Sequence, residues 1–287
     1  MSNPTNTALL FPGQGSQVDD MRDSVASSRP DLLSLAVSEV GCDPFSRVTE
    51  STRFAQPAIY CASVAALAGF PVDSSIGWMA GHSLGEFAAL VAAGSMSAED
   101  GLRLVALRGR LMDEAAGGDG TMLAIRGADA WEASVEIAFE SGAYPANHNS
   151  PTQVVLAGVE RAIEDAQRIA RGRGLRANVL PVRGAFHTPL MESAREPFAA
   201  ALADVEVLPP DVPVISGATA LPFSDVRAGL VDALTSPVRW SGVVEALSVA
   251  GATRFVEVGP GSVLTGLVRK TLGDVDATTV EEVARAA

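Results

Sequence analysis

Short apolar runs alternate with helical stretches along nearly the whole chain, and this alternation restricts the possible folds more than any other feature. Residues 8–11, 76–80 and 254–258 are predicted strands, and residues 56–68, 84–93 and 98–115 are predicted helices. Strands separated by helices of this length are typical of α/β proteins with a parallel sheet. With 287 residues, 47% of them hydrophobic and 19% charged, the chain is long and apolar enough to bury a large core.

A second pattern begins after the glycine-rich linker at residues 117–120. Its predicted elements are a strand (121–125), a helix (130–140), two strands (143–147 and 154–157), a helix (160–170) and a strand (177–182). This β-α-β-β-α-β order is that of a ferredoxin-like unit. We therefore predict a small ferredoxin-like domain, residues 120–187, inserted into a larger α/β domain of residues 1–119 and 188–287.

In the second part of the larger domain we expect a helix over residues 189–203, broken near Pro197, and a strand over residues 212–216. The turn Gly259-Pro260-Gly261 then leads into a last helix.

The charge balance excludes one class of function. The chain has 34 acidic and 21 basic residues, a net charge of −13 and a pI near 4.6. General nucleic-acid binding depends on neutralising phosphates, so we expect no nucleic-acid partner.

Membrane insertion and metal binding are not expected either. The longest charge-free span, residues 54–72, is interrupted by prolines and polar residues such as Gln56, which favours a buried helix over a membrane span. The start of the chain is polar, without a secretory signal, and Cys42 and Cys61 form no disulfide framework or zinc pattern. We expect a cytoplasmic protein without a metal.

A candidate nucleophile lies in Gly81-His82-Ser83-Leu84-Gly85, which matches G-x-S-x-G. An apolar strand precedes the motif and a helix of small and apolar residues follows it, as a nucleophile elbow requires. The larger domain is therefore predicted to be α/β-hydrolase-like. The alternative is an ordinary glycine-rich turn between a strand and a helix.

A serine hydroxyl needs a base, and the chain has three histidines. His82 adjoins Ser83 and would point away from its oxygen, and His148 is predicted to lie in a solvated loop. His187 precedes Thr188 and Pro189, which can begin a helix and place the ring at the positive end of its dipole. Position alone leaves His187 equally compatible with a catalytic and a structural role.

The helix capped by Ser97 carries three arginines, and its periodicity separates them. Arg103 and Arg110 share a face with acidic residues, whereas Arg108 shares its face with apolar ones such as Leu111. A buried arginine needs an anion. The anion is either an internal carboxylate or the carboxylate of a substrate.

Seven separate motifs together resemble the malonyl-CoA:acyl carrier protein transacylases and the related acyltransferase domains of polyketide synthases. They occur in family order and span nearly the whole chain. The motifs begin with Phe11-Pro-Gly-Gln-Gly-Ser-Gln17, Gly81-His-Ser-Leu-Gly-Glu86 and Leu107-Arg-Gly-Arg-Leu-Met112, and continue with Asn147-His-Asn-Ser-Pro151, Ala185-Phe-His-Thr-Pro-Leu-Met191, Pro237-Val-Arg-Trp240 and Glu257-Val-Gly-Pro-Gly261.

The resemblance implies a ping-pong mechanism. Ser83 would take malonyl from malonyl-CoA and pass it to the phosphopantetheine thiol of an acyl carrier protein, with His187 as base and then acid. The backbone N–H groups of Gln14 and Leu84 would form the oxyanion hole, and Arg108 would bind the malonate carboxylate. No cofactor is implied, and a monomer is expected.

The same resemblance assigns two more substrate-binding residues and shows one departure. Phe186, before the histidine, matches the malonyl-selective form, and Asn149 falls in the matching asparagine motif. Ala233 stands where the family often has a glutamine whose backbone carbonyl orients the histidine. A carbonyl needs no particular side chain, so the pair can survive.

An acidic carrier protein would need a local basic surface on this acidic chain. Between Asp165 and Glu192 there is no acidic residue but there are five arginines, and we take Arg171, Arg173 and Arg176 as candidate docking residues. A solvated basic face is an equal alternative. For the whole protein, the alternatives are an acyl hydrolase of the same fold or a discrete polyketide-pathway acyltransferase, and a non-catalytic docking protein.

Overall fold

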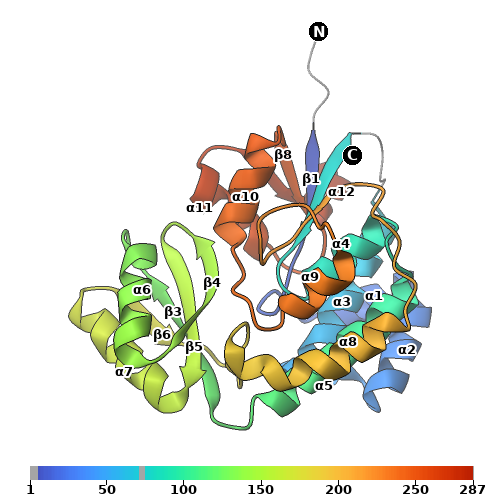
Figure 1. Ribbon diagram of the computed structural model, residues 1–287. Coiled ribbons are helices and arrows are strands. Elements are labelled where there is room, and N and C mark those ends of the chain that lie inside the picture. The colour runs from blue at the N-terminus through green and yellow to red at the C-terminus, as the bar shows by residue number, and fades with distance from the viewer. Residues whose placement is uncertain (1–5, 71–74, 287) are drawn as a thin grey trace.

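The computed structural model describes residues 6–70 and 75–286. The start of the polar N-terminal segment and the end of the charge-free span, residues 71–72, lie outside the described residues. Two sheets organise the structure (Figure 1). Their strands come from different parts of the chain, because the second sheet is formed within residues 120–179 alone.

The larger sheet is parallel and has the order β7-β2-β1-β8-β9. Its strands are β7 (Val214–Ile215), β2 (Ile76–Gly81), β1 (Thr7–Phe11), β8 (Arg254–Glu257) and β9 (Asp276–Thr279). The central strand β1 is buried at all five positions, which explains its unbroken apolar sequence.

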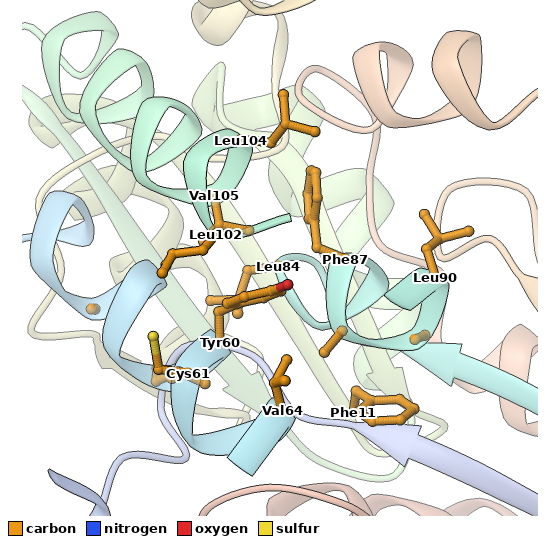
Figure 2. Close-up of a cluster of buried hydrophobic side chains, with 14 of the residues drawn as sticks. Phe11, Tyr60, Cys61, Val64, Leu84, Phe87, Leu90, Leu102, Leu104 and Val105 are labelled. Carbon is orange, nitrogen blue, oxygen red and sulfur yellow. The ribbon is translucent and has the colours of Figure 1, made fainter. Parts of the chain in front are cut away.

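Helices cover both faces of this sheet, as the alternating pattern predicts (Figure 1). Leu9 and Phe11 face a cluster that includes α3 (Thr52–Ala68), α4 (Gly85–Ala92) and α5 (Ala98–Ala115). Ala8 and Leu10 point to the other face and pack with α10 (Trp240–Val249) and α11 (Val263–Leu272). Figure 2 shows part of the first cluster, where Tyr60 and Val64 of α3 lie beside Leu84 and Phe87.

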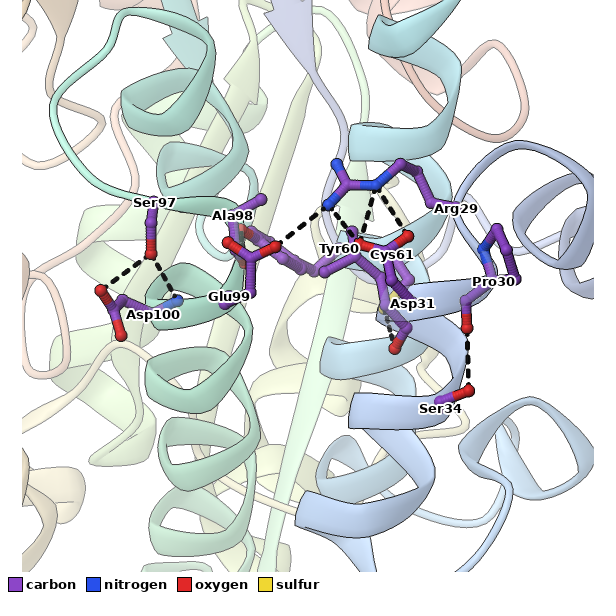
Figure 3. Close-up of polar contacts among 11 residues, drawn as sticks. Arg29, Pro30, Asp31, Ser34, Tyr60, Cys61, Ser97, Ala98, Glu99 and Asp100 are labelled. Carbon is purple, nitrogen blue, oxygen red and sulfur yellow. Dashed lines mark hydrogen bonds and ion pairs between the residues drawn. The ribbon is translucent and has the colours of Figure 1, made fainter.

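The remaining helices of this domain complete the first layer. They are α1 (Met21–Ser28), α2 (Pro30–Val40), the short 3-10 helix Pro44–Arg47, α8 (Arg195–Ala203), α9 (Val226–Asp232) and α12 (Val280–Ala286). The predicted cap of α5 is present, because Oγ of Ser97 accepts a hydrogen bond of 3.0 Å from the N–H of Asp100 (Figure 3). Tyr60 fastens this end of α5 to α3, because its hydroxyl donates to the carbonyl of Ala98 at 2.8 Å.

The smaller sheet is antiparallel and has the order β4-β5-β3-β6. Its elements are β3 (Gly120–Arg126), α6 (Ala130–Ser141), β4 (Tyr144–Ser150), β5 (Gln153–Val159), α7 (Glu160–Gly172) and β6 (Arg176–Val179). This order confirms the predicted β-α-β-β-α-β unit. The mixed α/β fold, with a parallel-sheet domain and a small inserted domain, is therefore as expected, while the domain boundaries stay predictions.

The predicted helical span 189–203 is confirmed, with its break near Pro197, whereas the prediction of the last helix was wrong. The helix over 189–203 changes at Arg195, where a 3-10 helix (Pro189–Ala194) gives way to α8, and Pro197 lies in the first turn of α8, where a missing N–H costs nothing. The strand β9 and helix α12 follow the helix that we expected to be last. β9 has the sequence Asp-Ala-Thr-Thr, which lacks an apolar run because it lies at the edge of the sheet. Within the described ranges, no helix is long and apolar enough to span a bilayer.

Candidate active site

Ser83 occupies a sharp turn between β2 and α4. Its backbone φ is +54°, a left-handed conformation that is uncommon for a residue other than glycine. The flanking glycines make the turn possible, since a Cβ on Gly81 would meet the backbone of Gly85, and a Cβ on Gly85 would meet the carbonyl of Phe11. The strand, turn and helix therefore present the Ser83 side chain at the carboxyl end of the parallel sheet, as the sequence predicts.

His187 lies next to the serine. Its Nε2 is 2.7 Å from Oγ of Ser83, and its Nδ1 is 2.9 Å from the carbonyl oxygen of Ala233. A carbonyl oxygen can only accept, so Nδ1 carries the proton, and Nε2 of the neutral ring is the acceptor for the serine hydroxyl. Burial, and then the nearby cation of Arg108, lower the pKa of His187 to about 3. The ring is therefore a neutral base at every pH near neutrality.

The position of His187 depends on local backbone structure. Its φ is +62°, so the ring, like Ser83, is carried on a left-handed backbone. Thr188 caps the 3-10 helix that follows by accepting from the N–H of Leu190 at 3.2 Å, and Pro189 takes the first helical position, as predicted. The carbonyl that orients the ring belongs to Ala233, so the departure from the glutamine pattern does not remove this contact.

Arg108 is buried, with an exposed fraction of 2%, while the other arginines of α5, Arg103 and Arg110, are about half exposed at their side chains (50% and 48%). The periodicity of α5 therefore predicted correctly that Arg108 is buried and that Arg103 and Arg110 are exposed. The Nη2 of Arg108 donates to Oγ of Ser83 at 3.1 Å, and its Nη1 donates to Oε1 of Gln56 at 2.6 Å. Burial lowers the pKa of Arg108 to about 10, an effect that Glu86 opposes, so the guanidinium is still charged at neutral pH.

Neither partner of Arg108 is a carboxylate. In the part of the chain that the structure describes, Arg108 forms no ion pair. The internal ion pair that was one alternative is therefore not formed. Arg108 is thus a buried cation whose charge is not matched within the protein, and it donates a hydrogen bond to the serine oxygen. This favours the second alternative, in which the anion is the carboxylate of a bound ligand.

Two residues that line the same cavity carry backbone N–H groups without an internal partner among the described residues. Gln14 lies in the glycine turn after β1, Leu84 follows the serine, and both line the pocket. Neither N–H group has a hydrogen-bond partner among the described residues. Free N–H groups beside a nucleophile are what an oxyanion hole requires.

The pocket has a volume of about 350 Å³ and lies between the two sheets. Ser83 and Arg108 line it from the large domain, and His187 lines it from the end of the inserted domain. Apolar side chains of the small sheet (Met122, Ala124 and Val155) and of α11 (Val263 and Leu267) line it as well, beside polar residues of the small sheet such as Arg126 and Gln153. Phe186 also lines it. The space can take an acyl group and a narrow flexible chain.

The asparagines of β4 meet His82 at the edge of the pocket. Oδ1 of Asn149 is 2.9 Å from Nε2 of His82, and both Asn149 and Asn147 line the cavity. The His82 ring lies 5.5 Å from that of Trp240, and no hydrogen bond joins it to Ser83 among the described residues. His148 does not lie in a solvated loop, since it is part of β4 and its ring stacks on that of Trp131 at 4.0 Å. The alternation of side chains along β4 places it on the face opposite the asparagines.

The candidate docking arginines differ in their surroundings. Arg173 forms ion pairs of 2.7 and 2.6 Å with Glu136 and Glu140 of α6, so its charge is matched within the small domain. Arg171 donates to the carbonyl of Ala177 at 3.2 Å. Arg176 forms no ion pair within the described ranges. The acid-free run in the sequence is thus not an acid-free surface.

Two site residues were not predicted. Gln56 was noted only as an interruption of a charge-free span, although a lone polar residue in an apolar helix is itself a signal. Glu86, the residue that follows the elbow, is 2% exposed and accepts from the N–H of Gly217 at 2.7 Å. Burial raises the pKa of Glu86 to about 7. No group of three metal-ligating side chains occurs among residues 6–70 and 75–286.

Comparisons with known proteins agree with this geometry. The sequence profile of the acyl transferase domain matches residues 9–286. A malonyl CoA-acyl carrier protein transacylase of Escherichia coli K12 is 37% identical over 300 residues, covering 97% of this chain and 96% of that protein. A polyketide biosynthesis protein of Burkholderia thailandensis is 42% identical over 280 residues, but the match spans only 24% of its length and 92% of this chain.

Solved structures extend the agreement to the fold. The acyl-carrier-protein S-malonyltransferase from Bartonella henselae has a TM-score of 0.90 and 33% identity, and the match covers 98% of each chain. The malonyl-CoA:acyl carrier protein transacylase from Xanthomonas oryzae has a TM-score of 0.89 and 35% identity, covering 100% of this chain and 98% of that one.

Proposed function

This chain belongs to the acyl transferase domain family, and from this premise we propose that it transfers malonyl from malonyl-CoA to the phosphopantetheine thiol of an acyl carrier protein, for fatty-acid or polyketide biosynthesis. One observation carries the proposal. The oxygen of Ser83 lies 2.7 Å from a neutral histidine and 3.1 Å from a buried arginine without a counterion. A nucleophile and a carboxylate-binding group are thereby combined in one pocket.

In the first half-reaction, Oγ of Ser83 attacks the thioester carbonyl of malonyl-CoA while its proton passes to Nε2 of His187. The N–H groups of Gln14 and Leu84 stabilise the oxyanion of the tetrahedral intermediate. When this intermediate collapses, the carbon–sulfur bond breaks and the coenzyme A thiolate takes the proton from His187. The product is a malonyl ester of Ser83.

The second half-reaction reverses the roles. The carrier thiol gives its proton to His187 and attacks the ester carbonyl, and the same N–H groups stabilise the new oxyanion. Collapse breaks the bond to Oγ, which regains the proton from His187. The malonyl carboxylate stays with Arg108 throughout, so the acyl group keeps its position while coenzyme A leaves and the carrier arrives.

Two further side chains complete the substrate site in this proposal. Phe186 lines the pocket beside His187 and limits the space for an α-substituent on malonyl. Asn149 lines it from β4, where its contact with His82 fixes the amide. Both assignments rest on the family pattern and on the position of the side chains at the cavity.

The carrier is proposed to dock beside the mouth of the pocket, on the side of β6. Arg176 is directly opposite Arg126 in the β3–β6 ladder, so both side chains point to the same face of the sheet, and Arg126 lines the pocket. Arg171 lies in the same part of the small domain. Arg173 is not proposed as a docking residue, because its charge is already matched by ion pairs with Glu136 and Glu140.

Intact-protein mass measurement tests the proposed function. Incubation with malonyl-CoA should add one malonyl group to the wild type and none to Ser83→Ala, and a phosphopantetheinylated carrier should then remove it and gain the same mass. Loss of the adduct at the same rate in buffer alone would identify an acyl hydrolase. The absence of any adduct would identify a non-catalytic docking protein.

A further inference from the structure

Gln56 is a buried polar side chain to which the proposed reaction assigns no step. It lies in the second turn of α3, with an exposed fraction of 2%. Its Oε1 accepts from Nη1 of Arg108 at 2.6 Å, and its Nε2 donates to Oγ1 of Thr52 at 2.8 Å. Because a guanidinium has donors only, the amide oxygen must face Arg108, and the Thr52 hydroxyl holds the amide in that orientation.

The absence of charge on Gln56 is the decisive property of this contact. A carboxylate at the same distance would form an ion pair with Arg108, and the positive charge of the guanidinium would then be neutralised within the protein. The amide provides the same acceptor geometry without a charge. Nη1 is thereby fixed, while the positive charge stays available on the side of Ser83, where Nη2 points.

The nearest acidic influence on Arg108 does not replace this ion pair. Glu86 acts on Arg108 only through space, since among the described residues no hydrogen bond or ion pair joins the two, and its Oε1 accepts from the N–H of Gly217. Burial raises the pKa of Glu86 to about 7, so the carboxyl group is partly protonated at neutral pH. The charge of Arg108 is therefore opposed weakly, and a ligand carboxylate is the anion that can match it.

We propose that Gln56 is a specificity-determining positioning residue, which orients Arg108 without neutralising it and so makes the pocket select acyl groups that end in a carboxylate. This role rests on the proposed malonyl transfer. It predicts that the discrimination between malonyl and acetyl depends on the charge at position 56, and not only on the packing there.

Two substitutions of similar size separate charge from packing. Gln56→Glu adds a charge, and Gln56→Met removes the acceptor without adding one. For each variant and the wild type, kcat/KM is measured with malonyl-CoA and with acetyl-CoA, and the melting temperature is recorded. In Gln56→Glu, the malonyl-to-acetyl ratio of kcat/KM should fall roughly 100-fold, the value of a charged hydrogen bond. In Gln56→Met, it should fall by less than about tenfold, because Arg108 keeps its charge.

Thr52→Val provides a second route that adds no charge to the core. It removes the stronger of the two acceptors of the Gln56 Nε2, Oγ1 of Thr52, and leaves only Sδ of Met112 at 3.4 Å, so the ratio should fall by roughly three- to tenfold. A residue with a purely structural role would change both substrates equally and leave the ratio constant.

The role of Gln56 is overturned by an unchanged ratio in Gln56→Glu, or by an equally large fall in Gln56→Met. Should Gln56→Glu not fold, an unchanged ratio in Thr52→Val overturns it instead. Malonylation of Ser83 in the wild type is the separate test of the proposed function. A wild type that transfers malonyl, combined with a constant ratio in the variants, refutes only the inference about Gln56.

Discussion

We expect that the His187→Asn variant loses less stability in acid than the wild type. Between pH 7.5 and pH 5, its free energy of unfolding should fall by about 2 kcal/mol less than that of the wild type. In the folded protein, burial and the cation of Arg108 lower the pKa of His187 from 6.5 to about 3. Asparagine cannot be protonated in this range, and its amide N–H can still reach the carbonyl of Ala233. The substitution therefore removes the titration while keeping one hydrogen bond.

The sign follows from where the proton binds. Below pH 6.5 the unfolded chain binds a proton at this histidine, and the folded protein does not do so until the pH approaches 3. The stability contributed by the neutral ring is thus complete above pH 6.5 and is lost as the pH falls towards 3. Each pH unit in this window costs about 1.4 kcal/mol, which gives about 2 kcal/mol at pH 5.

Urea unfolding at pH 7.5 and pH 5 measures this difference directly. The wild type, His187→Asn and the control Ser83→Ala are compared by the change in their free energy of unfolding between the two pH values. Burial also lowers the pKa values of His82 and His148, but these groups are present in all three proteins, so their contributions to the change in stability cancel in the comparison. If His187→Asn loses as much stability on acidification as the wild type, the conclusion that His187 is buried and neutral in the folded protein is wrong.

Three further predictions follow from particular contacts. Arg108→Ala should lower the malonyl-to-acetyl ratio of kcat/KM by up to about 10⁴, because the charge that rejects an uncharged acyl end is gone, and an unchanged ratio would remove Arg108 from the site. Gly81→Ala should lower the free energy of unfolding by about 3 kcal/mol and abolish acylation, because its Cβ would meet the backbone of Gly85; denaturant unfolding and mass measurement check both effects. Arg176→Glu should raise KM for the carrier at low salt and leave KM for malonyl-CoA unchanged, whereas the control Arg168→Glu, on an exposed side chain of α7, should change neither.

Local patterns in the sequence were sufficient for the main elements of the site. The G-x-S-x-G turn placed Ser83 on its elbow, and helix phase selected Arg108 as the buried arginine of α5. Both predictions concern residues whose environment is set by neighbours in the chain: a turn of five residues in the first case and the 3.6-residue period in the second.

Contacts between distant segments could not be found in this way. The segment between Asp165 and Glu192, which holds the candidate docking arginines, contains no acidic residue. Arg173 at the end of α7 nevertheless forms ion pairs with Glu136 and Glu140 of α6, more than 30 residues earlier in the chain, because the two helices pack side by side. The partner of Nδ1 on His187 is a backbone carbonyl, which every residue has and which therefore leaves no pattern in the sequence.

The sequence by itself determined the alternation of strands and helices, the order of elements in the inserted unit, and which side chains stand at the carboxyl end of the parallel sheet, since these depend on periodicity and turn chemistry. Only the tertiary structure decided the charge state of the site. It brought the neutral amide of Gln56, from a different helix, to the guanidinium of Arg108, and it buried His187 beside that cation. Desolvation and the identity of a partner 52 residues away depend on packing in three dimensions, which no local pattern encodes.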